Sequence, residues 1–386
     1  MFATLTAWIR SRGSGQFLMP VWAGLLVLPF TGVLRAAELA AVVLAGVLVG
    51  SLLRSGAAAS VFRAIAARSA GVRVFLAGSR AKLLSPSALT VLVLLLLVLP
   101  LVLNDYHRDI LTLTGLYVVL ALGLNLVVGQ TGLLNLGYVA FYAIGAYTYA
   151  ILSTRFGLWF WPGLAAGAAS AAVIAALIGL STLKLRGDYF AIVTLGFGEI
   201  TRIVLNNWDD LTGGPNGIAR IGRPVIAGHV MSTPLELYYL ILIVAIVTVF
   251  AMHRLIASRI GRAWIAIRED EIAAEAMGID TFRMKLLAFV IASAWAGVAG
   301  VFFAAKMAFV SPESFTFSES ILILCMVVLG GMGSLPGIVL GAFMLVMLPE
   351  MFRDFQDYRM LGFGVALVFM MVYRPQGLLG TGQITK

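Results

Sequence analysis

The sequence predicts an all-α, polytopic membrane protein, a helical bundle in which some helices are broken or re-entrant. Three observations lead to this fold class: the apolar fraction, the length of the apolar runs and the position of the charges. Of the 386 residues, 61% are hydrophobic and only 12% are charged, and the mean hydropathy is +1.00. A soluble domain has about 45–50% apolar and about 25% charged residues. The surplus of apolar residues needs lipid around it, because a soluble chain must present a polar surface.

The same composition excludes several other classes. The net charge of +9 would suit a nucleic-acid-binding protein, but the charges cluster between apolar runs, as membrane topology requires, so we expect no nucleic-acid partner. Cys325 is the single cysteine, which excludes an intramolecular disulfide. His107, His229 and His253 lack metal-ligand spacing, and no phosphate-binding loop pattern occurs. We therefore expect no metal and no cofactor on this chain.

Apolar runs that approach the length of a membrane helix, about 20 residues, recur along the chain. The first follows Arg10 and Arg12, an arrangement that also occurs in signal peptides. A second run follows at once, with no clear cleavage site, so both are interpreted as spans. The expected spans are residues 17–34, 36–53, 87–103, 110–128, 138–153, 162–183, 188–205, 235–252, 286–304, 320–348 and 359–373.

Lysines and arginines between the spans predict the orientation. Residues 54–86 and 253–285 each hold six of these cations, which favours the cytoplasmic side for both stretches and for the N-terminus. Residues 206–234 then face outward although they contain two arginines. We expect this long polar segment to fold as its own cap, with Thr212–Ile218 as a compact glycine-rich loop.

Two glycine-rich interruptions predict broken helices. The run 320–348 is too long for one ordinary helix and is interrupted at Gly330, Gly331 and Gly333, so we expect two pieces that enter and return. Polar backbone at membrane depth, as at residues 129–137, is tolerated only where protein buries it or water lines it. Such a break indicates a transport pathway, with close helix packing as the alternative. The candidate pathway residues here are Gln130, Thr131, Asn135 and Tyr138.

Glu199 and Arg202 lie three residues apart on one expected membrane helix. Ionisable residues inside a span are functional candidates. The alternative, which we favour, is an ion pair that helps each charge tolerate its depth. Glu199 is also the one carboxylate that we place deep enough to couple ion movement. The small residues of Gly163–Ala176, at spacings of four, are expected to serve helix packing.

Residues 261–285 predict a short cytoplasmic helix. Asp270 can cap it, Glu271 suits its first turn, and Gly278 fits a left-handed end. A helix of about two turns is not stable alone. Its apolar face must therefore rest on the bundle or on a cytoplasmic partner. That face comprises Ile272, Ala273, Ala276 and Met277.

Longer strings carry a specific resemblance. Together with Gly261–Gly278, they closely resemble the LivM-type permeases of branched-chain amino-acid ABC importers. The resemblance covers residues 86–380. Residues 1–85, two expected spans and a basic linker, look like the N-terminal extension of some of these permeases. The strings are LRGDYFAIVTLGFGEI (185–200), TGGPNGI (212–218), FVSPESFTF (309–317), VLGGMGS (328–334) and RPQGL (374–378).

The resemblance implies the fold of type II ABC importer permeases, located in the bacterial inner (cytoplasmic) membrane. It implies ATP-driven import of leucine, isoleucine, valine and other neutral amino acids, with this chain forming half of the pathway. It implies as partners a LivH-type permease subunit, two ABC ATPase subunits that hydrolyse the ATP, a periplasmic amino-acid-binding protein and the lipid bilayer. Thr212–Ile218 would then either cap the bundle or help to dock the binding protein.

The resemblance also implies that residues 253–285 couple the ATPase to the spans. Ile272–Gly278 resembles the family's E-A-A-x-x-x-G coupling motif, although Ile272 replaces its leading glutamate. We expect that reversing the four acidic charges of this region uncouples transport without unfolding the bundle. The candidate coupling residues are Arg262, Glu269, Asp270, Glu271, Ala274, Glu275 and Gly278.

Three other classes compete with this interpretation. A secondary transporter would need an ion gradient rather than ATP. A urea-type permease of the same superfamily would share the breaks and the coupling helix, so the longer strings alone argue against it. An intramembrane enzyme would need paired carboxylates, a His–Glu metal motif or a G-x-S-x-G elbow, and the sequence has none of these.

Overall fold

The computed structural model describes residues 96–184, 188–226, 228–351, 364 and 377. The expected spans 17–34 and 36–53 lie outside the described residues, as does 359–373 apart from Gly364. The basic stretch 54–86 and the end of the chain after residue 377 also lie outside them. The span expected at 87–103 is described from residue 96, and its residues 96–102 are helical.

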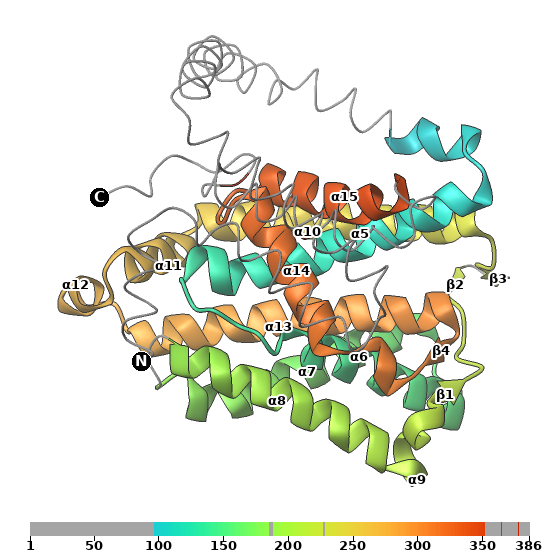
Figure 1. Cartoon of the computed structure of the whole chain (residues 1–386), viewed down its shortest axis with the longest axis horizontal. Coiled ribbons are helices and arrows are strands. Elements are labelled where there is room, and N and C mark those ends of the chain that lie inside the picture. The colour runs from blue at the N-terminus through green and yellow to red at the C-terminus, as the bar shows by residue number, and fades with distance from the viewer. Residues whose placement is uncertain (1–95, 185–187, 227, 352–363, 365–376, 378–386) are drawn as a thin grey trace, which may run out of the picture. The chain divides into compact units, whose positions relative to one another are not determined.

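Long helices dominate the described part of the chain (Figure 1). They are α5 (Asp105–Asn125), α6 (Tyr138–Phe156), α7 (Phe160–Thr182), α8 (Asp188–Asn207), α10 (Pro234–Ala257), α13 (Thr281–Met307), α14 (Phe317–Gly330) and α15 (Leu335–Met351).

Short elements join these helices. The helical ones are the π turn Leu126–Gln130, α9 (Asp209–Thr212), α11 (Arg259–Glu269), α12 (Glu271–Ala276) and the 3₁₀ turns Gly214–Asn216 and Pro312–Ser314. The strands form two antiparallel pairs, β1 (Ile218–Ala219) with β4 (Phe309–Val310), and β2 (Val225–Ile226) with β3 (His229–Val230).

Six helices within the described residues are long and apolar enough to cross a membrane, which confirms the predicted fold class. They are Asp105–Gln130, Phe160–Thr182, Tyr189–Asn207, Pro234–Ala257, Thr281–Met307 and Pro312–Gly330. The span expected at 138–153 forms helix α6 but is not one of these six. Its four buried tyrosines lower its hydropathy. Tyr138 bonds α13, Tyr149 packs on Phe160 of α7, and Tyr142 and Tyr147 pack on Phe315.

Glycines bring α6, α7 and α13 into backbone contact at the centre of the bundle. A methyl group added at Gly145 would overlap the carbonyl oxygen of Gly297, and one added at Gly297 would overlap that of Gly167. Small residues allow membrane helices to approach this closely. The packing role predicted for Gly163–Ala176 is confirmed by Gly167 and by Gly163, where an added methyl group would overlap the aromatic ring of Tyr149.

The run 320–348 is two helices, as the glycines predict. α14 ends at Gly330, and α15 begins at Leu335 and folds back on it. A methyl group at Gly341 would lie 2.5 Å from the carbonyl oxygen of Met326, and one at Gly330 would lie 2.5 Å from that of Gly337. α14 and α15 therefore form a tight helical hairpin.

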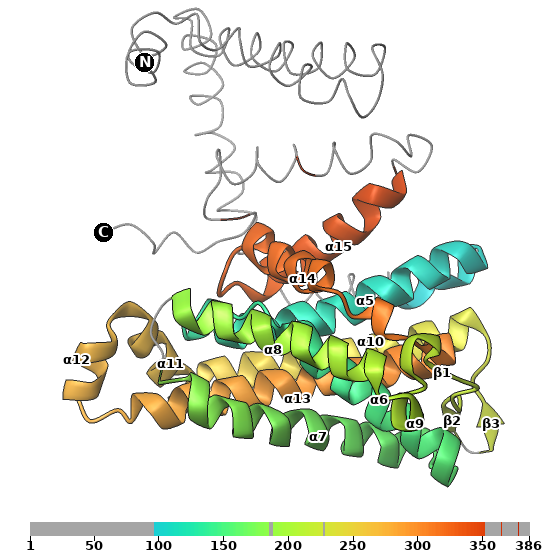
Figure 2. The same cartoon turned by 60° about the horizontal axis from the view of Figure 1, so that its bottom comes forward.

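The two ends of the bundle differ, as Figure 2 shows. α11 and α12 lie at one end, and α9 and the strands lie at the other. The segment 206–234 folds as expected: Gly213, Gly214 and Gly217 all have positive φ, and β1 pairs with β4 to tie the segment to the loop before α14.

Candidate functional site

The first break replaces the regular end of α5. The helix ends in the π turn Leu126–Gln130, and the backbone then runs without regular structure to α6. Gly132 has φ +74°, a left-handed value that favours glycine. The break expected at residues 129–137 is present, and most of its residues are buried inside the bundle. π turns within helices frequently mark functional positions.

The four candidate pathway residues are buried, and each bonds to backbone of the chain itself. In this conformation Gln130, Thr131 and Asn135 bond backbone at or next to the breaks, whereas Tyr138 bonds the regular helix α13, and their role in transport stays a prediction. The bonds join Gln130 Nε2 to Gly333 O (3.4 Å), Thr131 Oγ1 to Val127 O (2.7 Å), Asn135 Oδ1 to Gly137 N (3.0 Å) and the Tyr138 hydroxyl to Ala292 O (2.9 Å).

The second break meets the first. The Gly333 amide donates to Asn125 Oδ1 at 2.9 Å, and a methyl group added at Gly129 would lie 2.7 Å from the Gly333 nitrogen. Gly331 and Gly333 have φ of +107° and +86°, so the turn between α14 and α15 depends on their glycine backbone. Two interruptions that are far apart in the sequence therefore form one polar cluster.

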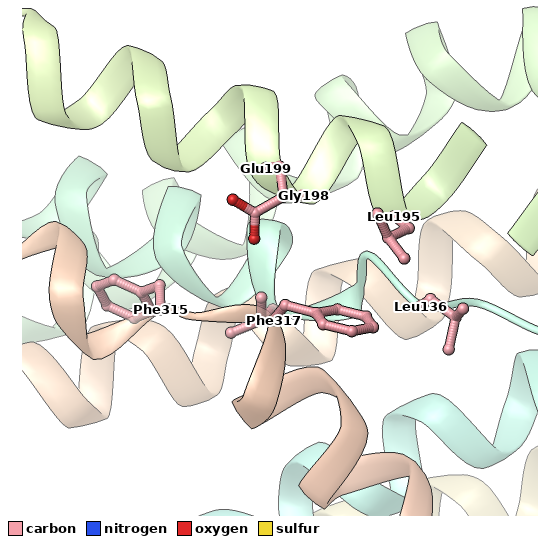
Figure 3. A pocket seen from close by; sticks show the side chains of 7 residues that line it. Leu136, Leu195, Gly198, Glu199, Phe315 and Phe317 are labelled. Atoms are coloured by element: carbon pink, nitrogen blue, oxygen red, sulfur yellow. The ribbon is translucent and has the colours of Figure 1, made fainter. Parts of the chain in front are cut away.

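A shallow hollow lies beside the first break (Figure 3). The space among its lining atoms amounts to about 170 Å³, open solvent included. Figure 3 shows the Glu199 carboxyl pointing from α8 toward the segment that holds Phe315 and Phe317. The walls are otherwise apolar, and in this conformation the space between them has no room for a water molecule. The lining residues are Leu136, Val139, Leu195, Gly198, Glu199, Phe315 and Phe317.

Glu199 and Arg202 form the ion pair that their spacing predicts. Arg202 Nη2 lies 3.0 Å from Glu199 Oε2, and the two side chains keep 32% and 34% of their surface exposed in this chain. α8 is the least enclosed of the six candidate spans, because only 17% of its most apolar 18-residue stretch is buried inside the described chain. A charged pair on such a helix would face lipid unless another protein covers it.

Glu319 is a second carboxylate that sequence reasoning misses. It lies in the first turn of α14, and Tyr117 of α5 donates a hydrogen bond to it at 2.8 Å. Glu319 is thus a second carboxylate within a candidate span, and the expectation that Glu199 alone lies deep enough in the membrane to couple ion movement stays a prediction. Glu319 stands next to the start of the run 320–348, so its position in the sequence looks like the solvated flank of a span.

The short helix expected within residues 261–285 forms as predicted. Asp270 caps α12 by accepting from the amides of Ile272 and Ala273 at 2.9 and 3.0 Å, and Gly278 has φ +85°. Ala274 is the one buried residue of α12. The expected apolar face points away from the bundle: Ile272 is 73% and Met277 83% exposed. The sequence left two supports open for this face, the bundle and a cytoplasmic partner. The described part of the bundle does not support it.

The other candidate coupling residues divide into two groups. Arg262, Glu269 and Glu275 are exposed, so a partner can reach them. Glu271 instead pairs with Lys285 of α13 at 2.6 Å, and Lys285 keeps only 8% of its side chain exposed. Asp270 and Glu271 thus stabilise α12 itself and its attachment to α13.

Comparison with known proteins gives one consistent family. Residues 106–373 match the family model described as "Branched-chain amino acid transport system / permease component". None of the solved structures matches the chain significantly.

Three relatives show how far the similarity extends. The chain is 47% identical over 314 residues to the high-affinity branched-chain amino acid transport system permease protein LivM of Escherichia coli K12, covering 75% of this chain and 74% of that protein. It is 48% identical over 294 residues to LivM of Salmonella typhimurium, covering 70% and 69%. It is 28% identical over 292 residues to LivH of Escherichia coli K12, covering 71% and 94%.

Proposed function

Because the chain belongs to the family of branched-chain amino-acid transport permeases, we propose that it is the LivM-type permease subunit of an ATP-driven importer. It is a multi-pass membrane protein that carries leucine, isoleucine and valine and supplies half of the translocation pathway. Leucine, isoleucine and valine are zwitterions with apolar side chains, so a pathway for them needs few polar groups and apolar walls.

The importer also needs partners, and we propose four kinds. A LivH-type permease supplies the other half of the pathway, and the similarity to LivH over 94% of that protein supports a partner of the same fold. Two ABC ATPase subunits hydrolyse the ATP, a periplasmic binding protein delivers the amino acid, and the assembly lies in the bacterial inner membrane. The exposed apolar residues Ile272 and Met277 support a cytoplasmic partner for α12.

The observation that carries the pathway proposal is the Glu199–Arg202 pair, which is about one-third exposed at the edge of α8, with Glu199 lining the hollow. A second permease subunit that packs on α8 would remove the pair from lipid and close the hollow into a path. Within it, Glu199 and Arg202 can bind the ammonium and the carboxylate of the substrate. Phe315 and Phe317 supply apolar wall for its side chain. Local unwinding at residues 129–137 leaves room for this path to change shape.

Two rival readings remain testable. A urea-type permease shares the breaks and α12 but needs no wall for an apolar side chain. A secondary transporter would use Glu199 or Glu319 to couple an ion, whereas the exposed face of α12 favours an ATP-driven partner.

The experiment is uptake of radiolabelled leucine into proteoliposomes that hold this chain, its LivH-type and ATPase partners and the binding protein. We expect uptake that requires both ATP and binding protein. Uptake driven by an ion gradient in this chain alone contradicts the proposal, and urea transport without leucine transport changes the substrate.

A further inference from the structure

We propose that Arg268 is a positioning residue that ties the cytoplasmic segment α11–α12 to both helix breaks, so that a partner displacing the segment moves the breaks. The inference rests on the function proposed above and adds to it the path by which movement reaches the membrane. Arg268 lies near the end of α11, two residues before the cap of α12.

The first observation is the bond from Arg268 to the first break. Its Nη1 donates to the carbonyl oxygen of Gly129 at 2.6 Å. That carbonyl lies in the π turn that ends α5, where helix carbonyls lack partners and the helix dipole favours a cation. A charge-assisted bond to such a carbonyl is stronger than a neutral one.

The second observation is that the same side chain packs against both breaks. A methyl group added at Gly132 would lie 3.3 Å from Arg268 Cγ, and one added at Gly333 would lie 3.4 Å from Arg268 Nη1. The aliphatic stem therefore covers the first break while the guanidinium lies against the second. A bulkier residue at either glycine would push the side chain away.

The two breaks are also joined to each other. Asn125 Oδ1 accepts from the Gly333 amide, and Gln130 Nε2 reaches the Gly333 carbonyl at 3.4 Å. The Asn125 amide nitrogen is buried and has no hydrogen-bond partner among the described residues. The Asn135 amide nitrogen in the first break is in the same position, so the cluster holds two unmet donors that a different arrangement of the breaks would be able to satisfy.

On the cytoplasmic side, Arg268 belongs to a rigid unit. Trp264 is fully buried and its indole donates to the Met284 carbonyl at 2.7 Å, which fixes α11 to α13. The Glu271–Lys285 pair fixes α12 to the same helix. Within the described part of the chain, Arg268 provides the one side-chain hydrogen bond from α11 or α12 to either break. A displacement of the unit must therefore move the breaks or break this bond.

The test is the number of leucine molecules imported per ATP hydrolysed in the complete importer. For Arg268→Gln we expect the binding protein still to stimulate ATP hydrolysis. Leucine uptake per ATP should fall about tenfold, which is the factor that corresponds to the free energy of one lost charge-assisted hydrogen bond. Arg268→Lys keeps the charge without the planar fork and is expected to fall between glutamine and wild type. Arg259→Gln is the matched control, because Arg259 is exposed at the other end of α11.

Each other outcome overturns the inference. If Arg268→Gln imports as much leucine per ATP as the wild type, the bond transmits no movement. If uptake and ATP hydrolysis fall together in an assembled complex, Arg268 has a structural role only. If Arg268→Gln does not assemble, Arg268→Lys decides, since a wild-type ratio there contradicts the proposal. A wild-type importer without ATP-dependent leucine uptake overturns the proposed function and this inference together, whereas a transporting wild type with an unaffected Arg268→Gln overturns the inference alone.

Discussion

Glu199 and Arg202 can each be replaced singly and together, and the three variants separate a structural pair from a substrate-binding one. Either glutamine variant leaves one charge unpaired on a membrane helix. Because both side chains are about one-third exposed, we expect each single variant to lose about 1–2 kcal/mol of folding stability. This lies between the losses for exposed and for buried ion pairs. The double variant removes both charges and should regain most of that stability.

Leucine uptake then decides the role. We expect the double variant to unfold near the wild-type temperature in detergent yet to transport poorly, because the ammonium and carboxylate of the substrate have lost their partners. Full recovery of uptake in the double variant would mean that the pair serves only to stabilise α8.

Among the elements, the contact of α6, α7 and α13 depends on glycine. We expect Gly297→Ala to destabilise the chain by about 1–3 kcal/mol, since the added methyl overlaps backbone of α7 and the well-packed helices must separate. Thermal unfolding of the purified chain measures this. Gly196→Ala on α8 is the control, because nothing lies within 4 Å of its added methyl. It should be neutral or stabilising by about 0.5–1 kcal/mol; equal destabilisation by both would contradict the packing argument.

The element α12 allows a sharper form of the charge-reversal prediction. Reversing Glu269 and Glu275, which are exposed, should abolish uptake while the helix stays capped by Asp270. Reversing Asp270 and Glu271 should instead loosen the segment, at a cost of about 1 kcal/mol for the cap alone, and leave Lys285 buried without its partner. Leucine uptake, stimulated ATP hydrolysis and protease sensitivity distinguish the two double variants, because only the reversal of Asp270 and Glu271 should make the segment more sensitive to protease. Normal stimulated hydrolysis after the first pair of reversals would argue against a coupling role.

Elements that depend on nearby residues were predictable from the sequence. Apolar runs, the glycines at 129–137 and 330–334, and the cap at Asp270 are local signals, and the helices, breaks and turn follow them. The contacts that make the candidate site are not local. Arg268 bonds a carbonyl 139 residues away, and Asn125 meets an amide 208 residues away. No spacing rule connects such partners, so neither residue stands out in the sequence.

At the largest scale that the structure describes, the bundle of residues 96–351 has two different ends and a middle that holds the helix breaks. One end exposes α12, the other carries the cap of α9 and the strands, and the broken helices lie between them. A signal that enters at α12 can therefore reach the hollow beside Glu199 only through the bundle. This arrangement is useful to an importer only if the α12 end is cytoplasmic.

The orientation can be tested with the chain's single cysteine removed by Cys325→Ser. In that background Met277→Cys reports on the α12 end and Ser232→Cys on the opposite end, and both positions are exposed. A membrane-impermeant maleimide cannot cross the hydrocarbon core. Because the cations of 253–285 favour the cytoplasm, we expect labelling of Ser232→Cys in intact spheroplasts and of Met277→Cys only after lysis. The reverse pattern would place α12 outside, where no ATPase can reach it, and the importer proposal would fail at the scale of the whole molecule.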